Sequence, residues 1–462
     1  MLTSLRIRNF KSWRDTGEVR LAPLTVIFGA NSAGKSSLGH LLLALKQTAL
    51  SADRKRALNL GDATTLVDLG TFEDCLHRHD LKSHLSFELR WSLPQSMEVR
   101  DTLNRAARYP GDTLLLHATL AADEKSRQPH TIRLDYKLSE KARETLSVRA
   151  TWEQAGKSSL TAKPFGLVKA QGRPWPVEEP EKFYRLSERS IARFQNAGFL
   201  TDFALATETM LRSIFYLGPL RQPPQRIYSW SGDTPEDVGQ DGRYTVAAIL
   251  AAETEGRRLN RGHKQALSLF SAFIAECLER LGVIDSFSVR PLAEGRKEYE
   301  VLIRTVAGGA EVKITDVGFG VSQVLPAIVQ AFYCPPGATV WMEQPEIHLH
   351  PQVQAELADV FIDAISARES GKPRNAQLIV ESHSEHFLNR LQRRIAEGIV
   401  THDQVAIYFA RRAGASTELE PLRLNEYGDI ENWPENFFGD EMADLTARTV
   451  AAGRRRQQEN SK

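Results

Sequence analysis

Apolar and polar positions at the start of the chain predict two strands, a loop and a helix. In residues 5–8, Leu and Ile alternate with Arg, which is typical of a half-buried strand. Residues 24–28 form a mostly apolar run that leads directly to Gly29. Beyond this glycine, leucines recur at positions 38, 41, 42 and 45, a spacing that places them on one face of a helix.

Apolar runs return in the last third of the chain, at residues 338–342, 377–380 and 405–409. Helical patterns lie between them, around residues 353–365 and 387–395. Strands that alternate with helices favour a mostly parallel sheet covered by helices. The expected fold class is therefore α/β.

The long interior differs from both ends. Residues 85–152 are typical of β structure, residues 182–215 of helix, and apolar positions in residues 259–281 predict one further helix. No heptad pattern persists, so we expect a globular α+β insertion and not a coiled coil. The expected division is an N-terminal part (1–84), an insertion (85–310), a C-terminal part (311–452) and a basic flexible tail (453–462).

Composition narrows the class of protein. The 462 residues carry 59 Lys and Arg against 58 Asp and Glu, so a charged partner must be met by a local patch. The three cysteines are widely spaced, which argues against a disulfide framework or a zinc site. Without a long apolar stretch, we expect a cytoplasmic protein that does not enter the membrane.

Residues 29–36 read GANSAGKS, a G-x-x-x-x-G-K-S motif between a predicted buried strand and a predicted helix. In such a loop, backbone N–H groups wrap phosphates, Lys35 reaches the β- and γ-phosphates, and the Ser36 hydroxyl binds Mg²⁺. The sequence therefore predicts a site for ATP and Mg²⁺. The residues expected to bind the nucleotide here are Asn31, Ser32, Ala33, Gly34, Lys35, Ser36 and Ser37.

Two further strand ends carry polar groups. Glu343 follows the apolar run 338–342 directly, where a P-loop ATPase needs an acid to hold the metal ion together with Ser36. His383 stands at the tip of the run 377–380, where it can bind a γ-phosphate, although a histidine alone is more often a satisfied structural residue.

These features occur in a familiar order. The chain resembles ATP-binding-cassette heads of the SMC and RecF type, and especially bacterial AAA-like ATPases related to the overcoming-lysogenisation-defect family. The resemblance covers residues 1–75 and 310–410, whereas most of 85–310 matches nothing. The motifs that carry it are residues 9–12 (NFKS), 29–36, 318–326 (GFGVSQVLP), 343–351 (EQPEIHLHP) and 382–384 (SHS), with 216–221 (YLGPLR) and 432–434 (NWP) as further marks.

The resemblance implies an ATP-binding-cassette type P-loop ATPase head that closes around ATP as a two-fold dimer or higher oligomer. It gives Gly320, Ser322 and Gln323 a role at the γ-phosphate bound by the opposite subunit. Taken alone, this segment would be interpreted as a glycine-rich turn before a helix.

Two departures from the pattern leave questions open. The position that usually holds the water-activating glutamate is Gln344, and an amide is not a base. Either Glu346 or His383 substitutes, or hydrolysis is slow and ATP mainly clamps the dimer. The glutamine loop that senses Mg²⁺ is unassigned, because Gln47 lies within the first helix and not after a following strand.

Three functions are compatible with these motifs. The first is an ATP-dependent switch that controls a separate effector, such as a nuclease, in anti-phage defence, a context that comes from the resemblance. The second is a DNA-repair or chromosome-maintenance ATPase, with residues 54–56, Arg221 and Arg226 as candidate contacts to a phosphate backbone. The third is a non-hydrolysing scaffold locked by ATP.

Overall fold

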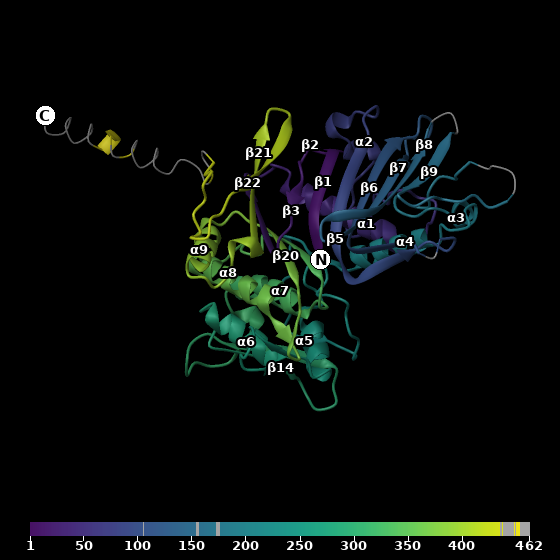
Figure 1. Cartoon of the computed structure of the whole chain (residues 1–462). Coiled ribbons are helices and arrows are strands. Elements are labelled where there is room, and N and C mark those ends of the chain that lie inside the picture. Colours follow the sequence, from purple (N-terminus) through teal and green to yellow (C-terminus); the bar gives the residue numbers. More distant parts are fainter. Residues whose placement is uncertain are drawn as a thin grey trace.

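Two large β-sheets of different kinds organise the chain in the computed structural model (Figure 1). The long antiparallel strands lie to the right in this view, and helices α8 and α9 lie to the left. The expected tail, 453–462, lies outside the described part of the chain. The structure describes residues 1–104, 106–153, 157–171, 176–434, 437, 448 and 450–452.

The six-stranded sheet confirms the α/β class. Its first five strands are parallel and its last is an antiparallel edge strand. Alternate residues of these strands enter two separate cores, so that Val26 and Val340 face one and Ile27 and Trp341 the other. Burial on both faces explains why the strands are continuous apolar runs. The order is β10 (Ile214–Leu217), β17 (Thr339–Glu343), β20 (Gln377–Glu381), β4 (Leu24–Gly29), β21 (Val405–Ala413) and β22 (Ser416–Leu422).

Strand β10 comes from the region 85–310, yet it belongs to the main sheet. It pairs in parallel with β17, from Ile214 opposite Thr339 to Leu217 opposite Met342. Since carboxyl ends of parallel strands share one edge, the loop after Leu217 emerges beside the loops that follow β4, β17 and β20.

The antiparallel sheet confirms the expected β-rich interior and joins it to the start of the chain. Strand β1 pairs with both β2 and β5, so the sheet runs across the boundary at residue 85. Helix α4 (Phe199–Arg212) contacts β5 and α1. The strands are β1 (Leu2–Phe10), β2 (Trp13–Asp15), β3 (Val19–Arg20), β5 (Leu85–Arg100), β6 (Arg108–Ala122), β7 (Pro129–Glu140), β8 (Arg143–Trp152) and β9 (Ser158–Lys163).

Helices cover the six-stranded sheet. Helix α1 (Lys35–Leu50) comes so close to β17 that a Cβ on Gly39 would collide with the Trp341 ring. The remaining helices are α2 (Phe72–Cys75), α3 (Glu188–Ala192), α5 (Thr245–Thr254), α6 (Phe270–Arg280), α7 (Phe319–Tyr333), α8 (Pro351–Ser366) and α9 (Glu385–Ala396), with short 3₁₀ turns at His77–His79, Ile314–Asp316 and His402–Gln404. Within the described residues, no helix is long and apolar enough to span a bilayer.

The helix expected over 259–281 is shorter than predicted. A turn around Gly262 separates its first residues, which form β12 (Arg258–Asn260) and β13 (Ser268–Leu269). Leu259 therefore packs from a strand, which an apolar spacing alone does not distinguish from a helix. The remaining short strands are β11 (Tyr228–Ser229), β14 (Ser286–Pro291), β15 (Glu298–Arg304), β16 (Val312–Lys313), β18 (Arg368–Glu369) and β19 (Lys372–Pro373).

Candidate nucleotide site

The loop between β4 and α1 has the backbone of a phosphate-binding loop. Gly29 and Gly34 adopt φ of 146° and 84°, a range that favours glycine, and Ser32 adopts φ of 61°. A Cβ on Gly34 would also collide with the Ser12 hydroxyl. Helix α1 begins without a side-chain cap, and of its first three N–H groups only that of Ser37 donates to a backbone carbonyl, that of Gly34 at 3.2 Å, which leaves its N-terminus open to an anion.

The predicted loop residues divide by exposure. Asn31 and Ser32 are exposed, whereas Ala33 is buried. Ser37 is buried and holds the loop itself, because its hydroxyl donates to the Gly34 carbonyl at 2.6 Å and accepts from Trp13 Nε1 at 2.8 Å.

Lys35 points back across the loop. Its Nζ donates to the Gly29 and Ala30 carbonyls at 2.8 and 3.1 Å and lies 3.0 Å from His383 Nε2. Burial lowers the pKa of Lys35. Burial and then the Lys35 charge lower the pKa of His383 to about 4, so the imidazole is neutral near pH 7 and accepts from the ammonium. The structure thus joins the P-loop lysine to the predicted histidine.

Two carboxylates meet beside this pair. Glu343 and Glu381 are register partners at the ends of β17 and β20. Tyr216 donates its hydroxyl to Glu343 Oε1 at 2.8 Å, and His40 Nε2 lies 3.5 Å from the same oxygen. The Ser36 hydroxyl donates to Glu381 Oε2 at 2.8 Å, so the residue predicted to hold the metal with Glu343 bonds the neighbouring acid.

The pKa values of Glu343 and Glu381 are shifted in opposite directions. Burial, followed by the charge of Glu343, raises the pKa of Glu381. Burial also acts on Glu343, but hydrogen bonds from His40 and Tyr216 outweigh it and lower the Glu343 pKa. Among the described residues there is no cluster of three or more His, Cys, Asp or Glu that fits a metal ion. One or two carboxylates and a serine hydroxyl nevertheless fit Mg²⁺, which usually takes its other ligands from phosphates and water.

Glu346 reaches the same edge through a tight turn. Gln344 begins this turn with φ of 45° and donates its N–H to the Glu381 carbonyl at 2.9 Å. Glu346 Oε1 then accepts from the Ser382 hydroxyl and from the His383 N–H, both at 2.7 Å. Glu346 Oε2 is buried without a hydrogen-bond partner, and burial raises the pKa of this carboxyl group.

The glycine-rich segment forms the N-terminal end of α7. Gly318 caps α7, and a Cβ on Gly320 would lie 3.4 Å from both the His348 carbonyl and Leu349. Ser322 and Gln323 are only 6% and 3% exposed. Ser322 lines a narrow pocket with residues 222–225 of its own chain, so in this conformation its side chain is covered. Its role opposite a second subunit stays a prediction.

Sequence reasoning missed four residues of the site: His40, Tyr216, Arg221 and Glu381. Tyr216 lies in β10 and Arg221 follows this strand, whose membership in the main sheet no local pattern reveals. Gln222 follows this strand, which is the position that the unassigned glutamine loop requires. Arg221 was a candidate DNA contact, but it is 9% exposed and its Nη2 donates to the Glu343 carbonyl at 3.3 Å.

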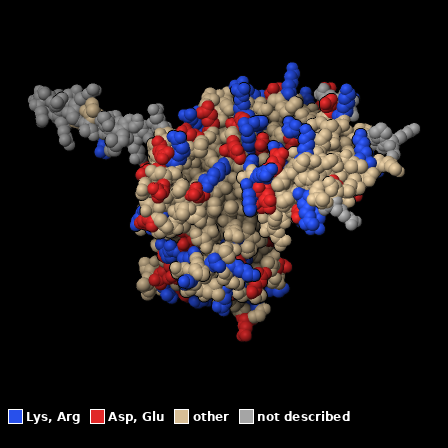
Figure 2. Space-filling model, viewed as in Figure 1, with Lys and Arg blue, Asp and Glu red and all other residues tan. Residues whose placement is uncertain are grey.

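The other candidate DNA contacts lie at the surface. Residues 54–56 are exposed, and Arg226 forms an ion pair with Asp316 at 2.8 Å. On the face shown in Figure 2, Lys and Arg are interspersed with Asp and Glu. Such mixing differs from the one-sided basic stripe that typifies nucleic-acid binding.

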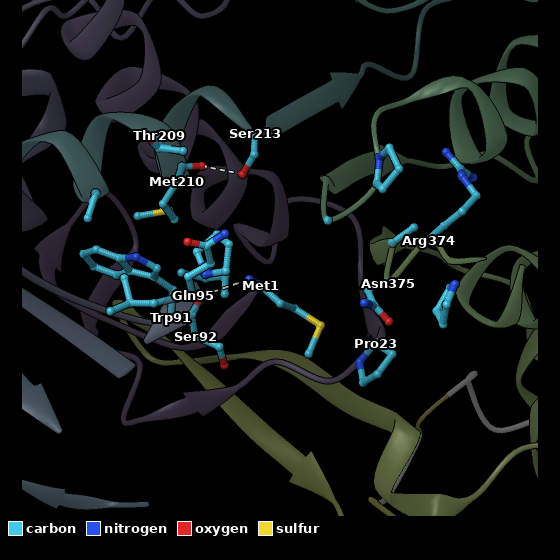
Figure 3. Close-up of a pocket in the computed structure, with 18 of the residues that line it drawn as sticks. Met1, Pro23, Trp91, Ser92, Gln95, Thr209, Met210, Ser213, Arg374 and Asn375 are labelled. Atoms are coloured by element: carbon cyan, nitrogen blue, oxygen red, sulfur yellow. Dashed lines mark hydrogen bonds between the residues drawn. The ribbon is translucent and has the colours of Figure 1, made fainter. Parts of the chain in front are cut away.

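A larger pocket, of about 1020 Å³, lies at the opposite edge of the six-stranded sheet (Figure 3). Pro23, Ser213 and Asn375 line it, and each precedes a parallel strand. Trp91 and Met210 form much of the wall on the side of the antiparallel sheet. The pocket is thus separated from the phosphate loop by the length of the strands.

Comparisons with known proteins match part of the chain to an ATPase domain. Residues 254–388 match a family described as AAA ATPase domain, and residues 400–447 match a protein family of unknown function, DUF3696. The first match contains Glu343, Glu346 and His383. No curated protein matches the chain.

Solved structures give loose superpositions on SMC heads. An Smc head bound to the C-terminal winged-helix domain of ScpA has a TM-score of 0.41 and 12% identity, with 92% of this chain and 98% of that chain covered. The SMC head domain of Thermotoga maritima has a TM-score of 0.38 and 11% identity, with 91% and 99% covered. The Smc head of Pyrococcus furiosus, bound to the C-terminal domain of ScpA, has a TM-score of 0.39 and 10% identity, with 92% and 96% covered. The matched ATPase domain, together with the phosphate loop, identifies the chain as an ATP-binding ATPase.

Proposed function

We propose that the chain is an ATP-driven switch, which closes as a dimer around ATP and Mg²⁺ and thereby controls a separate effector protein. One observation carries this proposal: Lys35 and Ser36 of the phosphate loop meet His383 and the carboxylates Glu343 and Glu381 at one edge of the sheet. A cation, a hydroxyl and acids in this arrangement suit a nucleoside triphosphate with its metal ion.

Binding replaces internal contacts with contacts to phosphate. The Lys35 ammonium would exchange the Gly29 and Ala30 carbonyls for β- and γ-phosphate oxygens, and His383 would stay beside it as a neutral imidazole. Ser36, Glu343 and Glu381 would hold Mg²⁺. The metal ion, when bound, neutralises charge that develops on the phosphates.

Glu346 is the better candidate to accept the proton of the attacking water. Its Oε2 has no partner and its pKa is raised by burial, as suits a general base, whereas Gln344 carries an amide. Two donors already bind the other oxygen of Glu346, Ser382 and the His383 N–H. These bonds favour the charged form and weaken the base, so we expect slow turnover and a long-lived ATP-bound state.

Dimer closure would use the first turn of α7. Gly320 and Ser322 would approach the γ-phosphate held by the partner, which requires the loop 222–225 to move away from Ser322. A two-fold arrangement would give two composite sites. Resemblance to ATPases of anti-phage defence supports a cytoplasmic role in which the effector is a nuclease.

The test compares the parent with Lys35→Ala and Ser322→Arg. ATP and Mg²⁺ should double the mass of the parent in light scattering. Lys35→Ala should lose ATP binding in calorimetry, and Ser322→Arg should bind ATP but remain monomeric. Equal masses for all three proteins with and without ATP would refute the ATP-driven dimer.

Measurement of phosphate release distinguishes the proposed switch from the two alternative functions. A parent that binds ATP but releases no phosphate would be a scaffold locked by ATP. Stimulation of phosphate release by DNA, at physiological salt, would instead indicate a DNA-gripping ATPase.

A further inference from the structure

Arg221 is a buried cation at the edge of the nucleotide site. It lies four residues beyond the end of β10 and is 9% exposed. Its Nη2 donates to the carbonyl of Glu343 at 3.3 Å, and this is the residue whose carboxylate binds Tyr216. The guanidinium is therefore fixed at the same strand ends as the metal-binding and phosphate-binding groups.

The rest of this guanidinium lacks partners. Arg221 Nε and Nη1 are buried without a hydrogen bond. Burial lowers the pKa of Arg221 to about 10, which leaves the group charged near pH 7. A charged group withdrawn from water with two unpartnered nitrogen atoms is costly, and a bound anion would offset that cost.

Arg374 shows how the fold treats an arginine with a structural role. It is 0% exposed, yet its Nη1 donates to the Ala331 carbonyl at 3.1 Å and its Nη2 donates to the Cys334 carbonyl. Its Nε makes no hydrogen bond, but an ion pair with Glu369 at 3.3 Å compensates the charge. The incomplete contacts of Arg221 are therefore not a consequence of burial alone.

A buried carboxylate at the same edge of the sheet also lacks a hydrogen-bond partner. Glu346 Oε2 has no hydrogen-bond partner, and the charges of Glu343 and Glu346 act on Arg221 without forming a direct ion pair with it. An unpartnered donor and an unpartnered acceptor suit a phosphoryl group with its attacking water, since phosphate oxygens accept from arginine and water donates to a carboxylate.

We propose that Arg221 contacts the terminal phosphate of a bound nucleoside triphosphate through Nε and Nη1, and so makes the site select the triphosphate over the diphosphate. This inference rests on the proposed ATP-dependent function and names a catalytic residue for it. It is supplied by the same chain, so it needs no second subunit.

In ATP hydrolysis, Arg221 would stabilise the charge on the γ-phosphate. Water attacks the γ-phosphorus, the bond between that phosphorus and the β–γ bridging oxygen breaks, and ADP and inorganic phosphate form. The proton of the water passes to Glu346. Arg221 offsets the charge spread over the γ-phosphoryl oxygens, a contribution of about 10³-fold or more in other phosphoryl-transfer enzymes.

The experiment uses Arg221→Met, with Arg226→Met as the matched control on the same loop. Arg226 is exposed and paired with Asp316, so it has no buried, unpartnered nitrogen atoms to lose. Calorimetry measures binding of ADP and of a non-hydrolysable ATP analogue with Mg²⁺, and thermal unfolding is measured without nucleotide. The preference of Arg221→Met for the triphosphate should fall about tenfold or more, because a charged hydrogen bond is lost. Its nucleotide-free Tm should equal or exceed that of the parent, since an uncompensated charge is removed.

A structural role predicts the opposite pattern. A lower nucleotide-free Tm with an unchanged triphosphate preference would overturn the proposal, as would equal effects in Arg226→Met. If Arg221→Met fails to fold, Arg221→Gln is measured in the same way, and failure of both variants to fold would also make Arg221 structural. A parent that binds neither nucleotide would instead defeat the proposed ATP-dependent function.

Discussion

Buried charge is handled in two ways in this molecule. On β7 of the antiparallel sheet, Asp135 is 4% exposed and accepts from Arg133 at 2.6 Å, Arg149 at 3.1 Å and His117 at 3.2 Å. At the edge of the six-stranded sheet, Arg221 and Glu346 are also buried, but they do not pair with each other. A saturated network stabilises one conformation, whereas an unsaturated one is ready for a ligand.

The pKa values of Asp135 and Glu346 differ in the same way. Burial acts to raise the pKa of Asp135, but hydrogen bonds from His117 and Arg133 outweigh it and lower the pKa to about 2. For Glu346 burial prevails over two hydrogen bonds, and the pKa is raised. The first carboxylate thus contributes to stability, and the second is suited to accept a proton.

Glu346→Gln should have the largest effect, a fall in kcat of about 10²- to 10⁴-fold, because it removes the proposed base. Binding of the ATP analogue and Tm should change little. Steady-state phosphate release is the measurement, with Gln344→Glu as the partner variant. If Gln344→Glu raises kcat strongly while Glu346→Gln leaves it unchanged, the base acts from position 344 and Glu346 is misassigned.

Asp135→Asn should lower the free energy of unfolding by about 2–3 kcal/mol, because two arginines lose a buried acceptor. Asp15→Asn is the control, since Asp15 also pairs with two arginines, Arg6 and Arg8, but its side chain is 37% exposed. That exposed pair should contribute about 1 kcal/mol or less. Urea unfolding checks both values, and equal losses would contradict the distinction.

Acid should weaken the fold through the same carboxylate. The folded pKa of Asp135, about 2, lies below an unfolded value near 3.9, so its contribution is complete above about pH 4 and declines as pH falls toward 2. Urea midpoints measured across this range should fall less in Asp135→Asn than in the parent. Parallel curves for the two proteins would show that Asp135 does not carry this pH dependence.

Tyr216→Phe should have a smaller effect. It removes one hydrogen bond to Glu343, and the Mg²⁺ concentration for half-maximal turnover should rise about fivefold, or about 1 kcal/mol. Tyr184→Phe is the matched control, because Tyr184 donates to Glu208 at 2.7 Å away from the site. The same Mg²⁺ dependence in both variants would remove Tyr216 from the metal site.

Local sequence patterns predicted much of the fold and part of the candidate site. The strand, loop and helix around residues 29–36, the strands before Glu343 and His383, and the mostly parallel sheet are confirmed by the structure, because each is encoded within a few neighbouring residues. Glu381 was overlooked because it ends an apolar run and its partner, Ser36, lies far away in sequence.

The rest depends on tertiary pairing. Strand β10 is four residues long and follows the antiparallel strands and two helices, so no spacing indicates that it joins β17. Tyr216 and Arg221 could therefore not be placed beside Glu343 from the sequence. The cover over Ser322 likewise arises from a loop about a hundred residues earlier, which a motif does not reveal.

The short strand β10 also joins the antiparallel sheet, through α4, to the six-stranded sheet. Helix α4, which contacts the antiparallel sheet, ends at Arg212, and β10 begins at Ile214 with its whole length paired to β17. A strand of this length spans about 13 Å and does not stretch. Because β10 is held in the six-stranded sheet, movement of this sheet on ATP binding would carry the end of α4 with it. We therefore expect ATP to slow hydrogen exchange in α4, whereas unchanged exchange would show that β10 does not couple α4 to the nucleotide site. Strand β10 is thus a rigid link between the helix that packs on the antiparallel sheet and the candidate nucleotide site.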